Sequence, residues 1–319
     1  MENHSEDMIN SSKQKNLFGF LRYEYTIEFD GGTVTLLPFY KESEAWVDEY
    51  LHEDGFLYPP LVSKYRCDPV TLKPIEKIPK TQRPANLHRI PPSHELILTG
   101  KKEDDDLRKE SGAFIIYLLS YLFGTRLQFY DWWFDKRVPI EKTHAISFQN
   151  ETVEDFLSYS ILNWKSWNDN ERKSFINLLY MHSRSPSYDW EWESFVIEYM
   201  VFDGLFSLAE SLGIFNSRKR IIRHKDRITL ICNIFEIPIN DTFVDQIIRL
   251  RNELIHNAIW DGGMPCSSGS HEAHLRVINL RRLNQRLIPA ILQYKTPYIR
   301  TGWWYLGQCI FEPRDRSAD

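Results

Sequence analysis

Hydrophobic and polar residues alternate near the start of the chain, a pattern typical of a half-buried β-strand. Over residues 23–29 apolar side chains occupy every second position, and Asp30-Gly31-Gly32 follows directly. A second run, residues 33–37, is rich in β-branched side chains. Alternation followed by a short Gly-containing turn and a second β-rich run predicts a β-hairpin over residues 21–40.

A proline-rich segment follows the predicted hairpin. Residues 59–92 contain eight of the sixteen prolines, which excludes a helix there and predicts loops with short edge strands. Residues 95–99 are a further candidate strand. The charged run 101–110 is expected to be a solvent-exposed boundary before the second part of the chain.

The second part of the chain has helical spacing. The apolar run 113–123 predicts a buried helix, and residues 127–134 predict a strand. Thr152 and Asp155 match a capping box at the start of the next helix. Apolar residues three and four positions apart then predict further helices. These are expected near residues 169–182, 190–212, 217–235, 241–260 and 274–293.

Together these patterns predict an α+β fold, in which a small β-rich N-terminal domain precedes a larger all-α helical bundle. We expect residues 1–16 to form a disordered arm and residues 17–110 a β-rich regulatory or sensing domain. Residues 111–150 would supply a connecting helix and strand, and residues 151–319 would form the helical domain.

The composition is that of a globular protein, because 42% of the 319 residues are hydrophobic and 26% are charged. The longest apolar run, residues 113–123, is too short to cross a hydrocarbon core of about 30 Å as a helix. The first sixteen residues are polar, so neither a membrane span nor a secretory signal is expected. The four cysteines form no CxxC pair, which favours free thiols and a cytoplasmic location.

The net charge of −5 at pH 7 conceals a difference between two regions. Residues 216–319 contain sixteen Lys and Arg against ten Asp and Glu, a net charge of +6. The rest of the chain contains 23 against 34, a net charge of −11, and the two sums add to −5. The acidic average therefore does not exclude a nucleic-acid partner.

The helix expected over residues 241–260 carries the side chains best suited to chemistry. Arg249, Asn252 and His256 are three, four and seven positions apart, so they share one polar stripe. Arg251 lies about 140° around the helix from His256 at 3.6 residues per turn, which favours a contact across a helix pair. Arginine can hold phosphate oxygens and histidine can transfer a proton near neutral pH, a pairing that suits RNA cleavage.

The segment Arg251-Asn252-Glu253-Leu254-Ile255-His256 resembles the Arg-x4–6-His motif of HEPN domains (higher eukaryotes and prokaryotes nucleotide-binding), with a polar residue directly after the arginine. The continuation to Trp260 and the upstream spacing Phe195-x3-Tyr199-x3-Asp203 are similar to Apea-like HEPN proteins. The resemblance covers roughly residues 151–293. It implies a helical bundle of a kind common in bacterial defence and toxin systems.

The resemblance also implies a metal-independent endoribonuclease without a cofactor, which dimerises so that two motifs form one cleft. Arg251 would bind the phosphate, His256 would be the general base or acid, and Asn252 would orient the substrate or His256. Arg249 fits the motif spacing as well. The family's polar residue after the arginine ranks Arg251 first, with Arg249 as a supporting phosphate contact, because Leu250 follows Arg249.

Expected partners are RNA, a second copy of the chain, and an antitoxin or a phage-derived activator. Basic residues near the motif are expected to contact the RNA backbone. They are Arg249, Arg218, Lys219, Arg220, Arg223, Lys225 and Arg227, with Arg276, Arg281, Arg282 and Arg286 adding basic residues on another helix. The alternatives are a catalytically inactive HEPN module that binds RNA, a nucleotide or a protein, and a dimerising scaffold.

Two other groups of residues resemble binding sites, but structural roles explain them better. Cys266, His271 and His274 could bind zinc, but a fourth ligand is missing from this segment, so no metal site is expected. The aromatic residues 132–134 and the tryptophans Trp164 and Trp167 are predicted to belong to the core rather than to a platform that stacks on bases.

Overall fold

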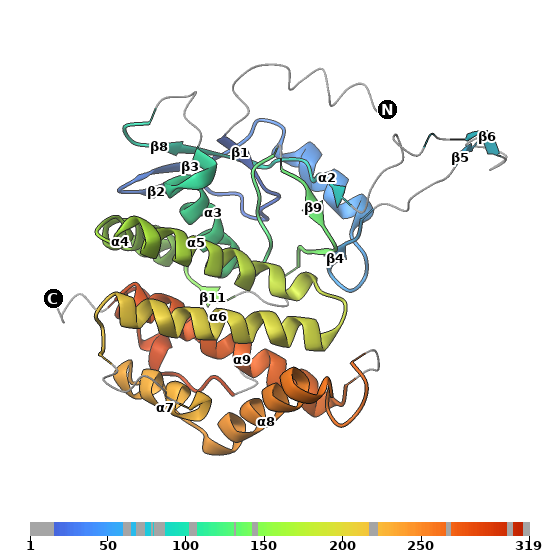
Figure 1. Cartoon of the computed structure of the whole chain (residues 1–319). Helices are drawn as coiled ribbons and strands as arrows, with labels where there is room; N and C mark the ends of the chain where they lie inside the picture. Colours follow the sequence, from blue (N-terminus) through green and yellow to red (C-terminus); the bar gives the residue numbers. More distant parts are fainter. Residues whose placement is uncertain are drawn as a thin grey trace.

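The computed structural model confirms the α+β fold class. It describes residues 16–59, 65–67, 74–77, 79, 87–101, 107–130, 132–141, 146–216, 223–265, 269–304 and 309–314. Residues 1–15 of the expected N-terminal arm lie outside the described residues. A sheet and a short helix lie at one end of the molecule, and pairs of helices follow in successive layers towards the other end (Figure 1).

The main sheet is antiparallel and contains the predicted hairpin. Its strand order is β1 (Leu17–Phe18), β8 (His94–Leu98), β3 (Gly32–Leu36) and β2 (Ile27–Phe29). Phe29 pairs with Gly32, so Asp30 and Gly31 form a two-residue turn. The first strand of the hairpin, β2, begins at Ile27, later than the alternating pattern over residues 23–29 suggested. The hairpin and the strand near residues 95–99 are thus confirmed.

Short strand pairs extend the N-terminal part. They are β4 (Phe56–Leu57) with β10 (Val138–Pro139), β5 (Tyr65–Cys67) with β6 (Pro74–Lys77), β7 (Leu87–His88) with β9 (Phe134–Asp135), and β11 (Ser147–Phe148) with β12 (Ile310–Phe311). Helix α2 (Tyr40–Tyr50) was not anticipated among these strands. The strand predicted over residues 127–134 was wrong, because strand geometry begins only at Phe134 and an isolated bridge at Phe129 precedes it.

Helices make up the rest of the described chain. They are α3 (Ser111–Phe123), α4 (Asn150–Lys165), α5 (Asp169–Arg184), α6 (Glu191–Ser211), α7 (His224–Ile234), α8 (Asp241–Asn257) and α9 (His271–Ile291), with the 3₁₀ turns η3 (Leu107–Lys109), η4 (Ser185–Ser187) and η5 (Pro297–Arg300). The capping box predicted at Thr152 was wrong: α4 begins at Asn150, and Thr152 is buried inside it. The structure forms a capping box at Asn168 and Glu171, at the start of α5. None of the helices in the described ranges is both long and apolar enough to cross a membrane.

The predicted buried helix α3 packs against α4 and α5, and eleven of its thirteen residues are buried. One hydrophobic cluster extends from sheet residues such as Val34 and Leu96 through α3 to Leu250 in α8. The hairpin also contacts α4, where the Ser158 hydroxyl accepts a hydrogen bond of 3.1 Å from the Asp30 amide. The sheet and the helices therefore share a continuous core, and the division into separate domains stays a prediction.

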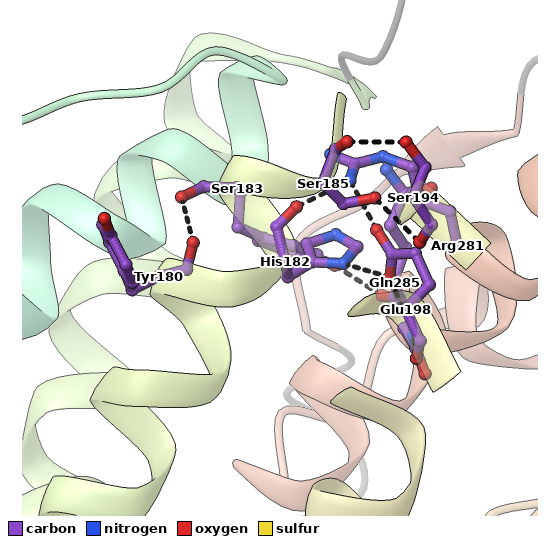
Figure 2. Close-up of polar contacts among 10 residues, drawn as sticks. Tyr180, His182, Ser183, Ser185, Ser194, Glu198, Arg281 and Gln285 are labelled. Carbon is purple, nitrogen blue, oxygen red and sulfur yellow. Dashed lines mark hydrogen bonds and ion pairs between the residues drawn. The ribbon is translucent and has the colours of Figure 1, made fainter. Parts of the chain in front are cut away.

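A buried polar cluster joins α5, α6 and α9. Figure 2 shows Glu198 from α6 beside His182 from α5 and Arg281 from α9. His182 Nδ1 donates to one Glu198 oxygen at 2.9 Å, and Arg281 Nη1 donates to the other at 2.7 Å. Asn284 Nδ2 donates to Glu198 Oε2 and to its carbonyl oxygen, both at 2.8 Å. Burial disfavours the charged carboxylate, but these three neighbours outweigh that cost and lower the pKa of Glu198 to about 2.

Replacement of Glu198 by alanine should destabilise the fold strongly. The change leaves the Arg281 guanidinium buried without its carboxylate, a loss of about 3–5 kcal/mol in the free energy of unfolding. The matched control is Glu191→Ala on the same helix, which removes a half-exposed pair with His274 and should cost less than about 1 kcal/mol. Urea denaturation measures both values, and equal losses would contradict a special role for Glu198.

A second buried titratable group lies in the sheet. His94 is fully buried, and its Nε2 donates to the Tyr23 carbonyl oxygen at 3.0 Å. Its Nδ1 then accepts from the Ser93 hydroxyl at 2.7 Å, so the ring is neutral. Burial lowers the pKa of His94 to about 4, although the bond to Tyr23 opposes this shift.

The free energy of unfolding should therefore fall as the pH drops from about 6.5 to about 4. In that window the unfolded chain binds a proton at residue 94 and the folded chain does not, a difference of about 3 kcal/mol. Over this pH range the free energy of unfolding of His94→Gln should fall by about 3 kcal/mol less than that of the unmodified chain, whatever its absolute value. Denaturation curves at pH 7, 5.5 and 4.5 measure this fall in both proteins, and an equal fall would contradict a buried neutral His94.

Candidate functional site

Helix α8 carries the predicted motif and packs through one narrow apolar face. Val244, Ile247, Leu250 and Leu254 are buried at helical spacing, as the pattern predicted. The Asn240 side chain caps the start of the helix by accepting from the Phe243 amide.

The C-terminal end of α8 differs from the prediction. The helix ends at Asn257, three residues before the predicted end, because Ala258 adopts a left-handed conformation with φ 54°. Ile255 and Ile259 are apolar but not buried, with exposed fractions of 52% and 37%. Trp260 is buried against Phe195 of α6, and this contact holds the chain after the helix.

The motif arginine and histidine are in direct contact along one helix. Arg251 Nη1 lies 3.1 Å from His256 Nε2 and also donates to Asn252 Oδ1 at 3.0 Å. The expectation that Arg251 and His256 would meet more readily across a helix pair was wrong, because the long arginine side chain spans the angle between the two positions. Arginine has only donors, so His256 Nε2 accepts and this ring nitrogen carries a lone pair.

Helices α6 and α7 complete the site. The guanidinium of Arg251 lies 5.8 Å from the ring centre of Tyr199 on α6. The Tyr199 hydroxyl is 2.8 Å from Nδ1 of His224, the first residue of α7. One turn further along α6, Asp203 accepts from Arg227 Nη1 at 3.1 Å. The arrangement places two imidazoles, a guanidinium and a phenol around one exposed region.

The electrostatics of this region favour neutral imidazole at His224. Burial lowers the pKa of His224, and the nearby positive charge of Arg251 lowers it further. The Asp203 carboxylate, 4.0 Å from His224 Nδ1, raises the pKa of His224, but it does not outweigh burial and Arg251. Burial also raises the pKa of Tyr199, so its hydroxyl keeps its proton at neutral pH.

The structure separates the two candidate arginines. Arg249 is 65% exposed, and its Nε lies 3.8 Å from Glu253 Oε1. It is Arg251 that reaches both His256 and Asn252. Arg249 is thus placed outside the contact that the motif residues make.

The predicted RNA-binding residues near α7 are only partly described. Lys225 lies 2.6 Å from Asp245 and Arg227 pairs with Asp203, while Arg223 is exposed. Arg218, Lys219 and Arg220 lie outside the described residues.

Three of the four arginines of α9 do not contribute to the expected basic surface, and Arg282 is partly buried. Arg276, Arg281 and Arg286 are at most 6% exposed and bind internal groups. Arg286, for example, donates to the carbonyl oxygens of Thr301 and Arg282. The expectation of a basic face on this helix was wrong, since these guanidinium groups hold the helical core together.

His224 is a residue of the site that lies outside the predicted motif. His224 was not predicted as a site residue because its segment was interpreted only as a source of basic residues, although its position ahead of an amphipathic stretch was visible in the sequence.

Within the described ranges, no group of three or more His, Cys, Asp or Glu side chains could hold a metal ion. Cys266 lies outside those ranges, and His274 pairs with Glu191 at 3.0 Å.

Comparisons of the chain with models of protein families, with curated proteins and with solved structures gave no match.

Loss of the Arg251 charge should raise the pKa of His224. The variant Arg251→Ala removes the second-largest cause of the lowered pKa, and the burial of His224 remains. NMR titration of the His224 ring protons measures the shift. Arg249→Ala, which removes an arginine from the same helix, should leave the His224 titration unchanged, and a similar shift in both variants would contradict the contact geometry.

Proposed function

We propose that this protein is a metal-independent endoribonuclease of the HEPN type, in which Arg251, Asn252 and His256 carry the reaction. The observation that supports the proposal most directly is the 3.1 Å contact between Arg251 Nη1 and His256 Nε2 on an accessible surface. This contact joins a guanidinium, which is always charged and can bind phosphate, to an imidazole, which can accept a proton. Both side chains lie near the C-terminal end of helix α8. The HEPN-like motif spacing adds to this geometry.

Substrate binding would release the base. A phosphodiester offers Arg251 two anionic oxygens, which compete with His256 Nε2 for its N–H groups. Once the guanidinium turns to the phosphate, the Nε2 lone pair is available to accept the proton of the ribose 2′-OH. Asn252, which is exposed and already bonded to Arg251, would orient the arginine or the substrate during this exchange.

The bond changes then follow from attack by the 2′ oxygen. This oxygen forms a bond to phosphorus, the bond from phosphorus to the 5′ oxygen breaks, and the leaving oxygen takes up a proton. The products are a 2′,3′-cyclic phosphate and a 5′-OH. Arg251 would stabilise the charge that builds up on the phosphoryl oxygens in the transition state.

A second copy of the chain would complete the site. Ile255 and Ile259 flank His256 in the sequence and are exposed at the end of α8, an arrangement that favours burial against another protein surface. A twofold pairing through this end of α8 would bring two motifs together. The second motif could then supply the proton that the leaving 5′ oxygen needs.

The test is cleavage of single-stranded RNA by the full chain in the presence of EDTA. His256→Ala and Arg251→Ala should each reduce the rate by at least about 100-fold, the scale of general acid–base and electrostatic contributions. Products with 2′,3′-cyclic phosphate ends identify the mechanism by mass spectrometry.

Matched controls come from the same region. His271→Ala, which removes an exposed histidine from the start of α9, should keep a near-normal rate, and Arg249→Ala should lower the rate only as far as one lost contact to the RNA backbone does. Full cleavage by His256→Ala, or loss of cleavage in EDTA, would contradict the mechanism. RNA binding without turnover, weakened by Arg251→Ala alone, would instead identify an inactive binding module.

A further inference from the structure

An open pocket of about 710 Å³ is lined by residues from η3, α3, the chain after α3 and α5, and by no residue of α8. Four aromatic side chains and two cationic ones line it: Tyr117, Trp132, Trp133, Tyr180, Arg108 and Lys173. The amide side chains of Gln128 and Asn177 complete its polar lining. The volume falls within the range of about 300–1,000 Å³ found for sites that bind small molecules.

The tryptophans of this pocket contradict a prediction from the sequence. Residues 132–134 were expected to lie in the core, but only Phe134 is buried. Trp133 is 51% exposed, and Trp132 is half-buried at the wall of the pocket. Exposure of a large apolar ring to water is unfavourable in free energy. The position of these tryptophans at a pocket rather than in the core therefore favours a role in binding.

The wall of the pocket is held in place by buried groups. Arg126 is 1% exposed, and its Nη2 lies 3.4 Å from the Tyr180 hydroxyl. With its amide oriented to satisfy both neighbours, Gln128 accepts from Arg126 Nη2 and donates to the Trp133 carbonyl oxygen, each at 2.9 Å. The segment that carries Trp133 is therefore anchored to the core before any ligand arrives, which lowers the entropic cost of binding.

The charged side chains among the described lining residues are cationic. Arg108 and Lys173 line it, and the guanidinium of Arg89 lies 4.3 Å from the ring centre of Trp133. Among the side chains that the structure places in the lining there is no carboxylate. Lys173 and Asn177 are four residues apart on α5, so they face the pocket from the same side of that helix.

We propose that this pocket binds a nucleoside phosphate. Aromatic rings stack on nucleobases whatever their sequence, amide side chains bond to base edges, and cations hold the phosphate. Trp132 and Trp133 would hold the base, and Arg108 and Lys173 would hold the phosphate. The inference does not depend on the ribonuclease reaction, because it uses none of the residues on α8.

The experiment is calorimetric titration of the full chain with AMP and GMP. A mononucleotide should bind with one-to-one stoichiometry and with an affinity that falls as salt is raised. Adenosine alone and inorganic phosphate alone should bind more weakly, since each keeps half of the contacts. Trp133→Ala should weaken binding of the mononucleotide by roughly five- to 100-fold, the scale of one lost stacking contact.

Matched variants separate the pocket from the rest of the surface. Lys173→Gln should weaken binding and reduce its salt dependence, whereas Lys165→Gln on α4 should not. Trp190→Ala, which removes another exposed tryptophan, should bind normally. His256→Ala should also bind normally, so failure of the ribonuclease proposal would leave this one standing.

Two results would overturn the proposal. One is the absence of mononucleotide binding by the unmodified chain, or binding that Trp133→Ala and Lys173→Gln both leave unchanged. The other is a short single-stranded RNA that binds through these two residues much more tightly than any mononucleotide, which would assign the pocket to a nucleic-acid strand instead of a free nucleotide.

Discussion

The buried carboxylate of Glu198 is the interaction on which the arrangement of the helices depends. An ionised group in a protein core is tolerated only where fixed donors surround it. Here the donors come from His182 on α5 and from Arg281 and Asn284 on α9. A shift of either helix along α6 would leave a buried charge without its partner. The cluster therefore sets the register of three helices, beyond any contribution that it makes to the free energy of unfolding.

The same helix connects this cluster to the candidate site. Tyr199 follows Glu198 directly and lies about 100° further around α6, so one residue faces the core cluster and the next faces α7 and α8. Asp203 lies four residues after Tyr199 on the same side and holds Arg227 of α7. The positions of His224 and Arg251 are thus set by a helix whose own orientation is fixed in the core. A site supported in this way keeps its backbone in place while the side chain of Arg251 can still exchange its contacts.

The sequence was most informative where structure depends on neighbouring residues. The hairpin, the buried helix α3 and most of α8 followed from spacing alone. The Arg251–His256 contact did not, because an angle between backbone positions ignores the reach of a long side chain. The burial of Arg281 also escaped prediction, since its carboxylate partner is 83 residues away in the chain and no local pattern distinguishes a buried arginine from an exposed one.

Charge shows the same limit. The sum over residues 216–319 predicted a basic surface, but the buried arginines of α9 belong to the core, and Lys225 is paired with Asp245. Affinity for a polyanion grows with the number of cations that remain available to phosphates. Such pairing lowers that number around α8, so recognition at the motif would depend more on the geometry of Arg251 and its neighbours than on a diffuse positive field.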